Sequence, residues 1–182
     1  ISYYKLTNVI DNKILDGHGS NATMAINIIS SDTIDNNLVE GNMLLKNQGS
    51  MVYITGYTYA QSDIANVSIN SNIISFCQNY FAIYSSSLSG MSIQGNIFSN
   101  NYVNHVFIGY YVKDVVLYGN VTHTSWQNGV VTDYGSGNIH MIGNNLQGSD
   151  HQAATQYNAI TIASGTTGVT LLGNRYDGLT SS

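Results

Sequence analysis

Apolar and polar residues alternate along short stretches of this chain, and each such stretch ends in a small residue followed by Asn. MSIQGN ends at Asn96, VVLYGN at Asn120, IHMIGN at Asn144 and VTLLGN at Asn174. An alternation with period two predicts β-strands rather than helices. Gly and Asn tolerate positive φ, so the closing pair predicts a tight turn after each strand.

The phrase returns over the whole chain at intervals of 24 or 30 residues. The anchor residues are Asn12, Asn42, Asn72, Asn96, Asn120, Asn144 and Asn174. The residues three before each anchor are all apolar, and those five before and two after it are mostly apolar. The side chains at these three positions, which we call stations of the repeat, are therefore expected to point inward. A third short strand is expected later in each repeat, at 25–28, 52–54, 82–84, 106–108, 130–132 and 159–162.

Three short strands per repeat predict an all-β fold, a single-stranded parallel β-helix of about six to seven coils that spans residues 1–182 as one domain. Coils stack about 4.8 Å apart, so the anchor residues should form an amide ladder. The longer repeats should place loops chiefly at 16–23, 55–64 and 148–158. A left-handed hexapeptide helix is the rival, but segments 99–105 and 146–156 lack an apolar residue at every sixth position.

Composition narrows the function classes. Charged residues make up 8% of the chain against 43% hydrophobic, with 14 Tyr and no Pro. The net charge is −5 with only five Lys and Arg, which argues against a nucleic-acid partner. No run of 18 apolar residues exists, so no membrane insertion is expected.

The chain begins at Ile1 in repeat-like sequence, and we expect it to be a fragment of a longer one. Cys77 is single, which excludes an internal disulfide, and a buried position suits it.

Acidic residues are the first candidates for chemistry. Glycoside hydrolysis needs two carboxyl groups about 5 to 9.5 Å apart, and no such pair stacks within one chain. Asp133, expected above Gly109 and Ser85, and Asp150, in the insertion after Asn144, are the catalytic candidates. The alternative for each is a solvated or turn-capping side chain. The His residues share neither a column nor i, i+4 spacing, and no phosphate-binding loop exists, so we expect no metal and no cofactor.

Aromatic residues give the clearer signal. Tyrosine and tryptophan rings beside Asn, Gln and Asp suit sugars, because rings pack on C–H faces while amides and carboxylates bond hydroxyls. The alternative is that these rings lie at a subunit interface or cover strand edges. The candidate substrate-binding residues are Tyr84, Tyr102, Tyr110, Trp126 and Tyr134.

A row of outward residues suggests a partner surface. The station two before each anchor reads Ile10, Glu40, Asn70, Gln94, Tyr118, Ile142 and Leu172, and Val116 lies on the same outward face. The C-terminal coils thus expose apolar side chains, which are costly to leave in water. Threefold self-association is the expected use of this row.

Three segments carry a resemblance to a known family. NVSINSNIIS (66–75), GMSIQGNIFSNN (90–101) and VTLLGNRYDG (169–178) resemble the repeats of right-handed parallel β-helix proteins of the pectate-lyase-like superfamily. The resemblance covers nearly the whole chain and implies a right-handed helix. The lack of Pro and the Asn-, Ser- and Tyr-rich surface look most like a bacteriophage tailspike or tail-appendage protein.

That resemblance implies a homotrimer that binds, and often cleaves, bacterial surface polysaccharide, located in the virion tail or outside cells. Pectate lyases of the superfamily hold calcium with Asp clusters beside a basic residue, but this chain lacks an acidic cluster, and Arg175 is its only Arg. Two other readings stay open at this point. One is a purely structural shaft or adhesin passenger, and the other is a monomeric secreted polysaccharide lyase or hydrolase.

Overall fold

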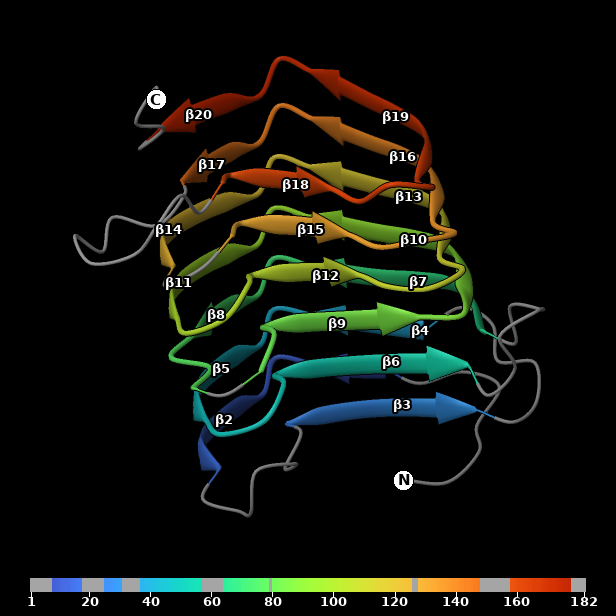
Figure 1. The fold of residues 1–182 in the computed structure, drawn as a ribbon. Helices are drawn as coiled ribbons and strands as arrows, with labels where there is room; N and C mark the ends of the chain where they lie inside the picture. The colour runs from blue at the N-terminus through green and yellow to red at the C-terminus, as the bar shows by residue number, and fades with distance from the viewer. Residues whose placement is uncertain are drawn as a thin grey trace.

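The computed structural model describes residues 8–17, 25–30, 37–56, 64–78, 80–125, 128–147 and 158–177. The described residues form strands and no helix, so none is long and apolar enough to cross a membrane as a helix. The strands pair in parallel across three sheets, each of which runs the length of a solenoid (Figure 1). The predicted parallel β-helix is confirmed.

Each coil contributes one strand to every sheet in turn. Sheet A contains β1 (Asn8–Ile10), β4 (Asn37–Glu40), β7 (Ile64–Asn70), β10 (Leu88–Gln94), β13 (Lys113–Tyr118), β16 (Gly137–Ile142) and β19 (Thr167–Leu172). Sheet B contains β2 (Lys13–Gly17), β5 (Met43–Asn47), β8 (Ile73–Ser75), β11 (Ile97–Asn101), β14 (Val121–Ser125), β17 (Asn145–Gln147) and β20 (Arg175–Asp177). Sheet C contains β3 (Ile26–Ser30), β6 (Val52–Gly56), β9 (Ile83–Ser86), β12 (Val106–Ile108), β15 (Val130–Thr132) and β18 (Ile160–Ile162).

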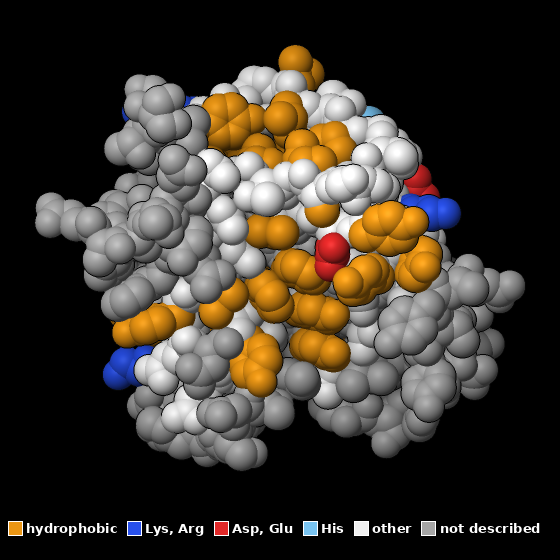
Figure 2. All heavy atoms as spheres, in the orientation of Figure 1, with side chains coloured by type: hydrophobic (Ala, Val, Ile, Leu, Met, Phe, Trp, Pro, Cys, Tyr) orange, Lys and Arg blue, Asp and Glu red, His pale blue; other side chains and the backbone are white. Residues whose placement is uncertain are grey.

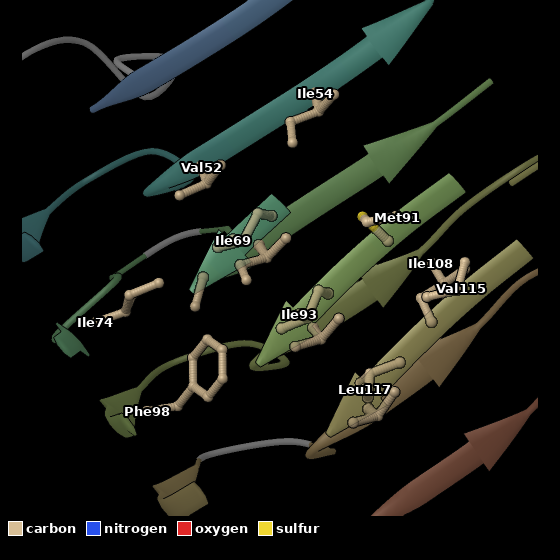
Figure 3. Close-up of a cluster of buried hydrophobic side chains, with 14 of the residues drawn as sticks. Val52, Ile54, Ile69, Ile74, Met91, Ile93, Phe98, Ile108, Val115 and Leu117 are labelled. Atoms are coloured by element: carbon tan, nitrogen blue, oxygen red, sulfur yellow. The ribbon is translucent and has the colours of Figure 1, made fainter. Parts of the chain in front are cut away.

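The predicted inward stations line the interior. Side chains from all three sheets meet there, among them Ile54, Ile69, Phe98 and Leu117, which have no exposed surface (Figure 3). Each such column repeats one apolar position in successive coils, so every coil packs on the next as well as across the helix. The burial of apolar area is the main favourable contribution to folding. The predicted loop insertions fall largely outside the described residues.

The anchor residues form the predicted ladder between sheets A and B. At Asn96, the side-chain Oδ1 accepts bonds from the backbone N and the Nδ2 of Asn72, both at 2.9 Å. Its Nδ2 donates to the carbonyl of Ile69 at 2.7 Å and to Oδ1 of Asn120 at 3.0 Å. Asn42, Asn72, Asn120 and Asn144 repeat the same four bonds. These buried amides are therefore fully hydrogen-bonded, which removes the cost of burying them.

The residue before each anchor has positive φ in all seven coils, as the turn prediction required. Five of the coils place Gly there, but Ser71 holds φ 57° and Asp11 holds φ 55°. A non-glycine residue in this region carries a steric cost of roughly 1 kcal/mol. The strain at these two positions is therefore local to the turn before the anchor.

We expect Ser71→Gly to raise the free energy of unfolding by about 0.5–1 kcal/mol, because glycine adopts this φ without strain. Urea unfolding followed by circular dichroism measures the change. Ser68→Gly is the matched control, since Ser68 lies in the preceding strand β7 without positive φ and should lose stability instead. A destabilised Ser71→Gly variant would contradict this account of the turn.

One predicted strand is shifted. The equal spacing of the anchors placed residues 82–84 beneath 106–108, but β9 begins at Ile83 and pairs Tyr84 with Phe107 and Ser85 with Ile108. The corner before β9 is one residue longer than the corner above it, and the corner after β9 is one residue shorter. Asp133 consequently does not lie above Ser85, because Ser85 shares its column with Ile108 and Thr132.

Candidate functional site

The outer face of sheet C and the turn that follows it bring together four of the predicted site residues. Tyr84 lies on β9, Tyr110 follows β12, and Asp133 and Tyr134 follow β15. Figure 2 shows hydrophobic side chains gathered over this face, with few charged groups among them. Tyr102 lies at the opposite corner, between β11 and β12, and is exposed. Trp126 and Asp150 lie outside the described residues.

An aromatic stack runs along sheet C parallel to the solenoid axis. Tyr53 and Tyr84 have ring centroids 4.7 Å apart and planes 7° apart, and Tyr84 and Phe107 follow at 5.3 Å and 8°. Phe81 packs beside them, 4.5 Å from Phe107. Because neighbouring strands are about 4.8 Å apart, rings on consecutive coils stack face to face. The ring faces inside the stack are covered by each other, so only edges and hydroxyl groups face outward.

Sequence reasoning missed Tyr53, Phe81 and Phe107 as members of this group. The middle residue of the third strand reads Asn27, Tyr53, Tyr84, Phe107, Val131 and Thr161 in successive coils. This column is recognisable only when the shift of β9 is known. With the unshifted spacing, Tyr84 falls in a different column from Phe107, and the stack is hidden.

Three exposed tyrosines line the turn after sheet C, and we call them the tyrosine edge: Tyr110, Tyr111 and Tyr134. Tyr134 has 59% of its surface exposed. Its ring lies against Gly165 in the next coil, where an added Cβ would come 2.6 Å from Cδ2 of Tyr134. Tyr111 lies against Gly135 in the same way, with the corresponding distance to its Cδ1 at 3.3 Å. Each of these two rings therefore rests on a glycine one coil further along.

Tyr111 also has an unusual backbone. Its φ is 57°, and Ser87, Gly135 and Gly165 hold positive φ at the equivalent place in other coils. A bulky residue in this region is strained, and such strain often marks functional positions. Glycine serves the same turn elsewhere in the solenoid, so the turn itself does not require a tyrosine. The strained conformation is compatible with a role for the exposed ring.

Asp133 holds its carboxylate beside the tyrosine edge. Oδ1 accepts a 2.7 Å bond from the backbone N–H of Tyr134. The Asp133 carbonyl accepts bonds from Oγ of Ser136 at 2.6 Å and from Oγ1 of Thr166 at 3.2 Å. These contacts are those of a turn-stabilising aspartate. Asp133 is half-buried at the surface, and its carboxylate remains able to accept a hydrogen bond from a ligand hydroxyl.

Nucleophilic and metal chemistry have little support in the described part of the chain. Cys77 is buried, and burial raises the pKa of its thiol to about 12, so it stays protonated at neutral pH. Within the described ranges, His, Cys, Asp and Glu form no group of three that could hold a metal ion. The thiol donates to the carbonyl of Gly49 at 3.0 Å, so Cys77 acts as a packed core residue.

The outward row of sheet A lies as expected. Ile10, Glu40, Asn70, Gln94, Tyr118, Ile142 and Leu172 pair in consecutive register. Leu172 and Tyr118 are exposed by 61% and 54%, and Ile142 between them is half-buried. This apolar row lies on a different sheet from the aromatic stack. Among the described residues, exposed apolar side chains thus lie on sheet A and on the sheet C side, and also on sheet B at Leu15, Ile73 and Ile97.

Comparison with protein families agrees with the architecture. The model of the right-handed β-helix region matches residues 2–176, nearly the whole chain. The chain belongs to the right-handed β-helix family, which confirms the predicted hand and fold class. None of the curated proteins compared with the chain matches it.

Proposed function

We propose that this chain is the β-helical part of a phage tailspike or tail appendage and binds bacterial surface polysaccharide through the tyrosine edge. The observation that carries the proposal is the grouping of exposed Tyr110, Tyr111 and Tyr134 beside Asp133. Exposed ring faces receive the C–H faces of sugars, and phenol and carboxylate oxygens bond their hydroxyls. A location in the virion tail or outside cells is part of the same proposal.

Binding is better supported than hydrolysis. A glycosidase needs a second carboxyl group about 5 to 9.5 Å from the first, and Asp133 has a turn-stabilising role that explains its place. Asp150, the proposed partner, lies outside the described residues. If the protein does shorten a polysaccharide, Asp133→Asn should abolish the shortening and leave binding in place.

The outward row of sheet A supports self-association, and we propose a homotrimer. Tyr118, Ile142 and Leu172 form a continuous apolar strip in the last three coils, where this row contains no charged residue. Covering such a strip with equivalent strips of two further copies would remove it from water. The tyrosine edge, on another side of the solenoid, would stay open to ligand.

A structural shaft is the second candidate, and the aromatic stack favours it. Tyr53, Tyr84 and Phe107 cover each other's faces, so they brace the coils and leave no inner ring face for a sugar. This reading makes no use of the exposed rings of the tyrosine edge. The two candidates therefore differ in what substitution of Tyr134 does.

We expect Tyr134→Ala and Tyr110→Ala each to weaken polysaccharide binding about three- to tenfold, because each removes one exposed ring contact. The protein is first mixed with a panel of bacterial capsular and O-antigen polysaccharides, and light scattering reports its mass and the polymer's length. Affinity for any polymer that binds is then measured by calorimetry. Tyr80→Ala is the control and should keep its affinity, because Tyr80 is an exposed tyrosine between β8 and β9, outside both the tyrosine edge and the outward row of sheet A. Binding that survives both tyrosine-edge substitutions would remove the tyrosine edge from the site.

A further inference from the structure

A groove of about 460 Å³ crosses the outer face of sheet A near the start of β7, β10 and β13. Its volume lies within the range of small-molecule sites. The groove lies on a different sheet from the aromatic stack, and none of the tyrosine-edge residues lines it. The groove is therefore a separate candidate site from the tyrosine edge.

Three residues at the rim of the groove share one position in successive coils. Asn66, Gly90 and Asp114 occupy it, and all three have positive φ. Asn66 and Asp114 carry side chains, but Gly90 between them has none. An added Cβ at Gly90 would come 2.9 Å from Oδ1 of Asn66, so the Asn66 side chain lies against the Gly90 backbone.

The floor of the groove alternates in chemical character. Leu38, Ser68, Ser92 and Val116 pair in consecutive register and point outward, half-buried. The two serine hydroxyls thus lie between two apolar side chains. An arrangement of this kind offers hydrogen bonds in the centre and apolar contact at both ends, as small polar ligands require.

Asp114 is held in place at the rim. Its Oδ1 accepts a 2.6 Å bond from Nδ2 of Asn138, whose Oδ1 lies 3.0 Å from Nε2 of His140. One carboxylate oxygen is thereby fixed, which orients the whole group. A fixed acceptor loses little conformational freedom when it binds a ligand.

From these features we propose that the groove binds one or two units of an uncharged, hydroxyl-rich ligand, that is, a neutral sugar. Hydroxyl groups would donate to the Asp114 carboxylate and exchange bonds with Ser68 and Ser92, while C–H groups would contact Leu38 and Val116. Of the described residues that line the groove, Asp114 is the only charged one, so the groove repels anions. A single carboxylate is also too few ligands for a divalent cation.

Saturation-transfer NMR tests the proposal with glucose, galactose, mannose, rhamnose and N-acetylglucosamine, and with glucuronate as the anionic comparison. We expect transfer to at least one neutral sugar and none to glucuronate. Ser92→Phe should abolish the transfer because its ring fills the groove. Asp114→Gly should weaken binding roughly tenfold or more, because a charge-assisted bond is lost while glycine suits the positive φ.

Thr170→Phe is the matched control, since Thr170 holds the same outward station in β19, two coils beyond Val116. It should bind as the wild type does. The groove is excluded if no neutral sugar shows transfer or if Ser92→Phe leaves transfer intact. Loss in Ser92→Phe with retention in Tyr134→Ala supports the groove whatever the fate of the tyrosine edge. Loss only in Tyr134→Ala supports the tyrosine edge and overturns the groove.

Discussion

The Asn96→Asp variant is expected to lose about 4 kcal/mol or more of its free energy of unfolding at pH 7. The substitution keeps Oδ1, which accepts two bonds from Asn72. It replaces Nδ2 by an oxygen that faces the carbonyl of Ile69 and Oδ1 of Asn120, at the positions now bonded at 2.7 and 3.0 Å. A buried carboxylate between two oxygens is repelled by both and loses its hydration.

The pH dependence of this variant follows from the same contacts. Burial and repulsion raise the folded-state pKa of the introduced carboxyl group above the unfolded value of about 3.9. The folded state then binds more protons between these two values, so stability falls as pH rises through that window. At low pH the protonated carboxyl group also regains one O–H donor. The difference in free energy of unfolding between wild type and Asn96→Asp should therefore become smaller as the pH is lowered from 7 to 4.

Urea unfolding midpoints at both pH values measure the effect. Asn174→Asp is the matched control in the same ladder. Asn174 is only half-buried, and its Nδ2 makes one described bond, to the carbonyl of Met141, so a smaller loss is expected. Gln94→Glu adds the same charge at an exposed position two residues away and should change little. Equal midpoints for Asn96→Asp and wild type would mean that the ladder does not stabilise the solenoid.

Acid destabilisation through His105 is the second large effect that we expect. His105 is fully buried against Phe98, with ring centroids 5.7 Å apart. Its Nδ1 lies 2.9 Å from Nδ2 of Asn101, which must donate. The Asn101 amide cannot turn round, because its Oδ1 accepts from the backbone N–H of Cys77 at 2.9 Å. Protonation of Nδ1 would therefore place its N–H against the N–H of Asn101 Nδ2, so that two donors would face each other.

Burial, with a smaller contribution from the charge of His123, lowers the pKa of His105 from 6.5 to about 3. The unfolded chain takes up a proton below pH 6.5 while the folded chain does not, so stability falls as pH decreases from 6.5 towards 3. The loss that His105 contributes should reach about 3 kcal/mol by pH 4.

Unfolding midpoints measured from pH 7 to pH 4 isolate this contribution when wild type is compared with His105→Gln. Glutamine does not titrate, and its oxygen can still accept from Asn101. The variant should show a flatter pH dependence below 6.5 than wild type. His140→Gln, on the outer face of sheet A, controls for the loss of a histidine side chain. The same slope in His105→Gln and wild type would disprove the assignment.

The repeat in the sequence is sufficient to predict the fold class, the coil length and the ladder. Alternation with period two requires strands, and a repeat that restores the same residue at each station requires parallel coils in register. The inward stations and the positive φ before each anchor follow from local residue types such as Ile93 and Gly95. Those features depend on neighbours along the chain or on the equivalent position one coil away, and a repeat makes both visible.

Which residues share the candidate functional surfaces depends on packing in the folded chain. The aromatic stack depends on the one-residue shift of β9, because corners of different length exchange a residue without changing the spacing of the anchors. The tyrosine edge depends on how the rings of Tyr111 and Tyr134 rest on glycines of the next coil. The groove depends on which residues of β7, β10 and β13 come together in successive coils. Anchor spacing fixes the length of a coil, but the division of that length between strands and corners is set by packing.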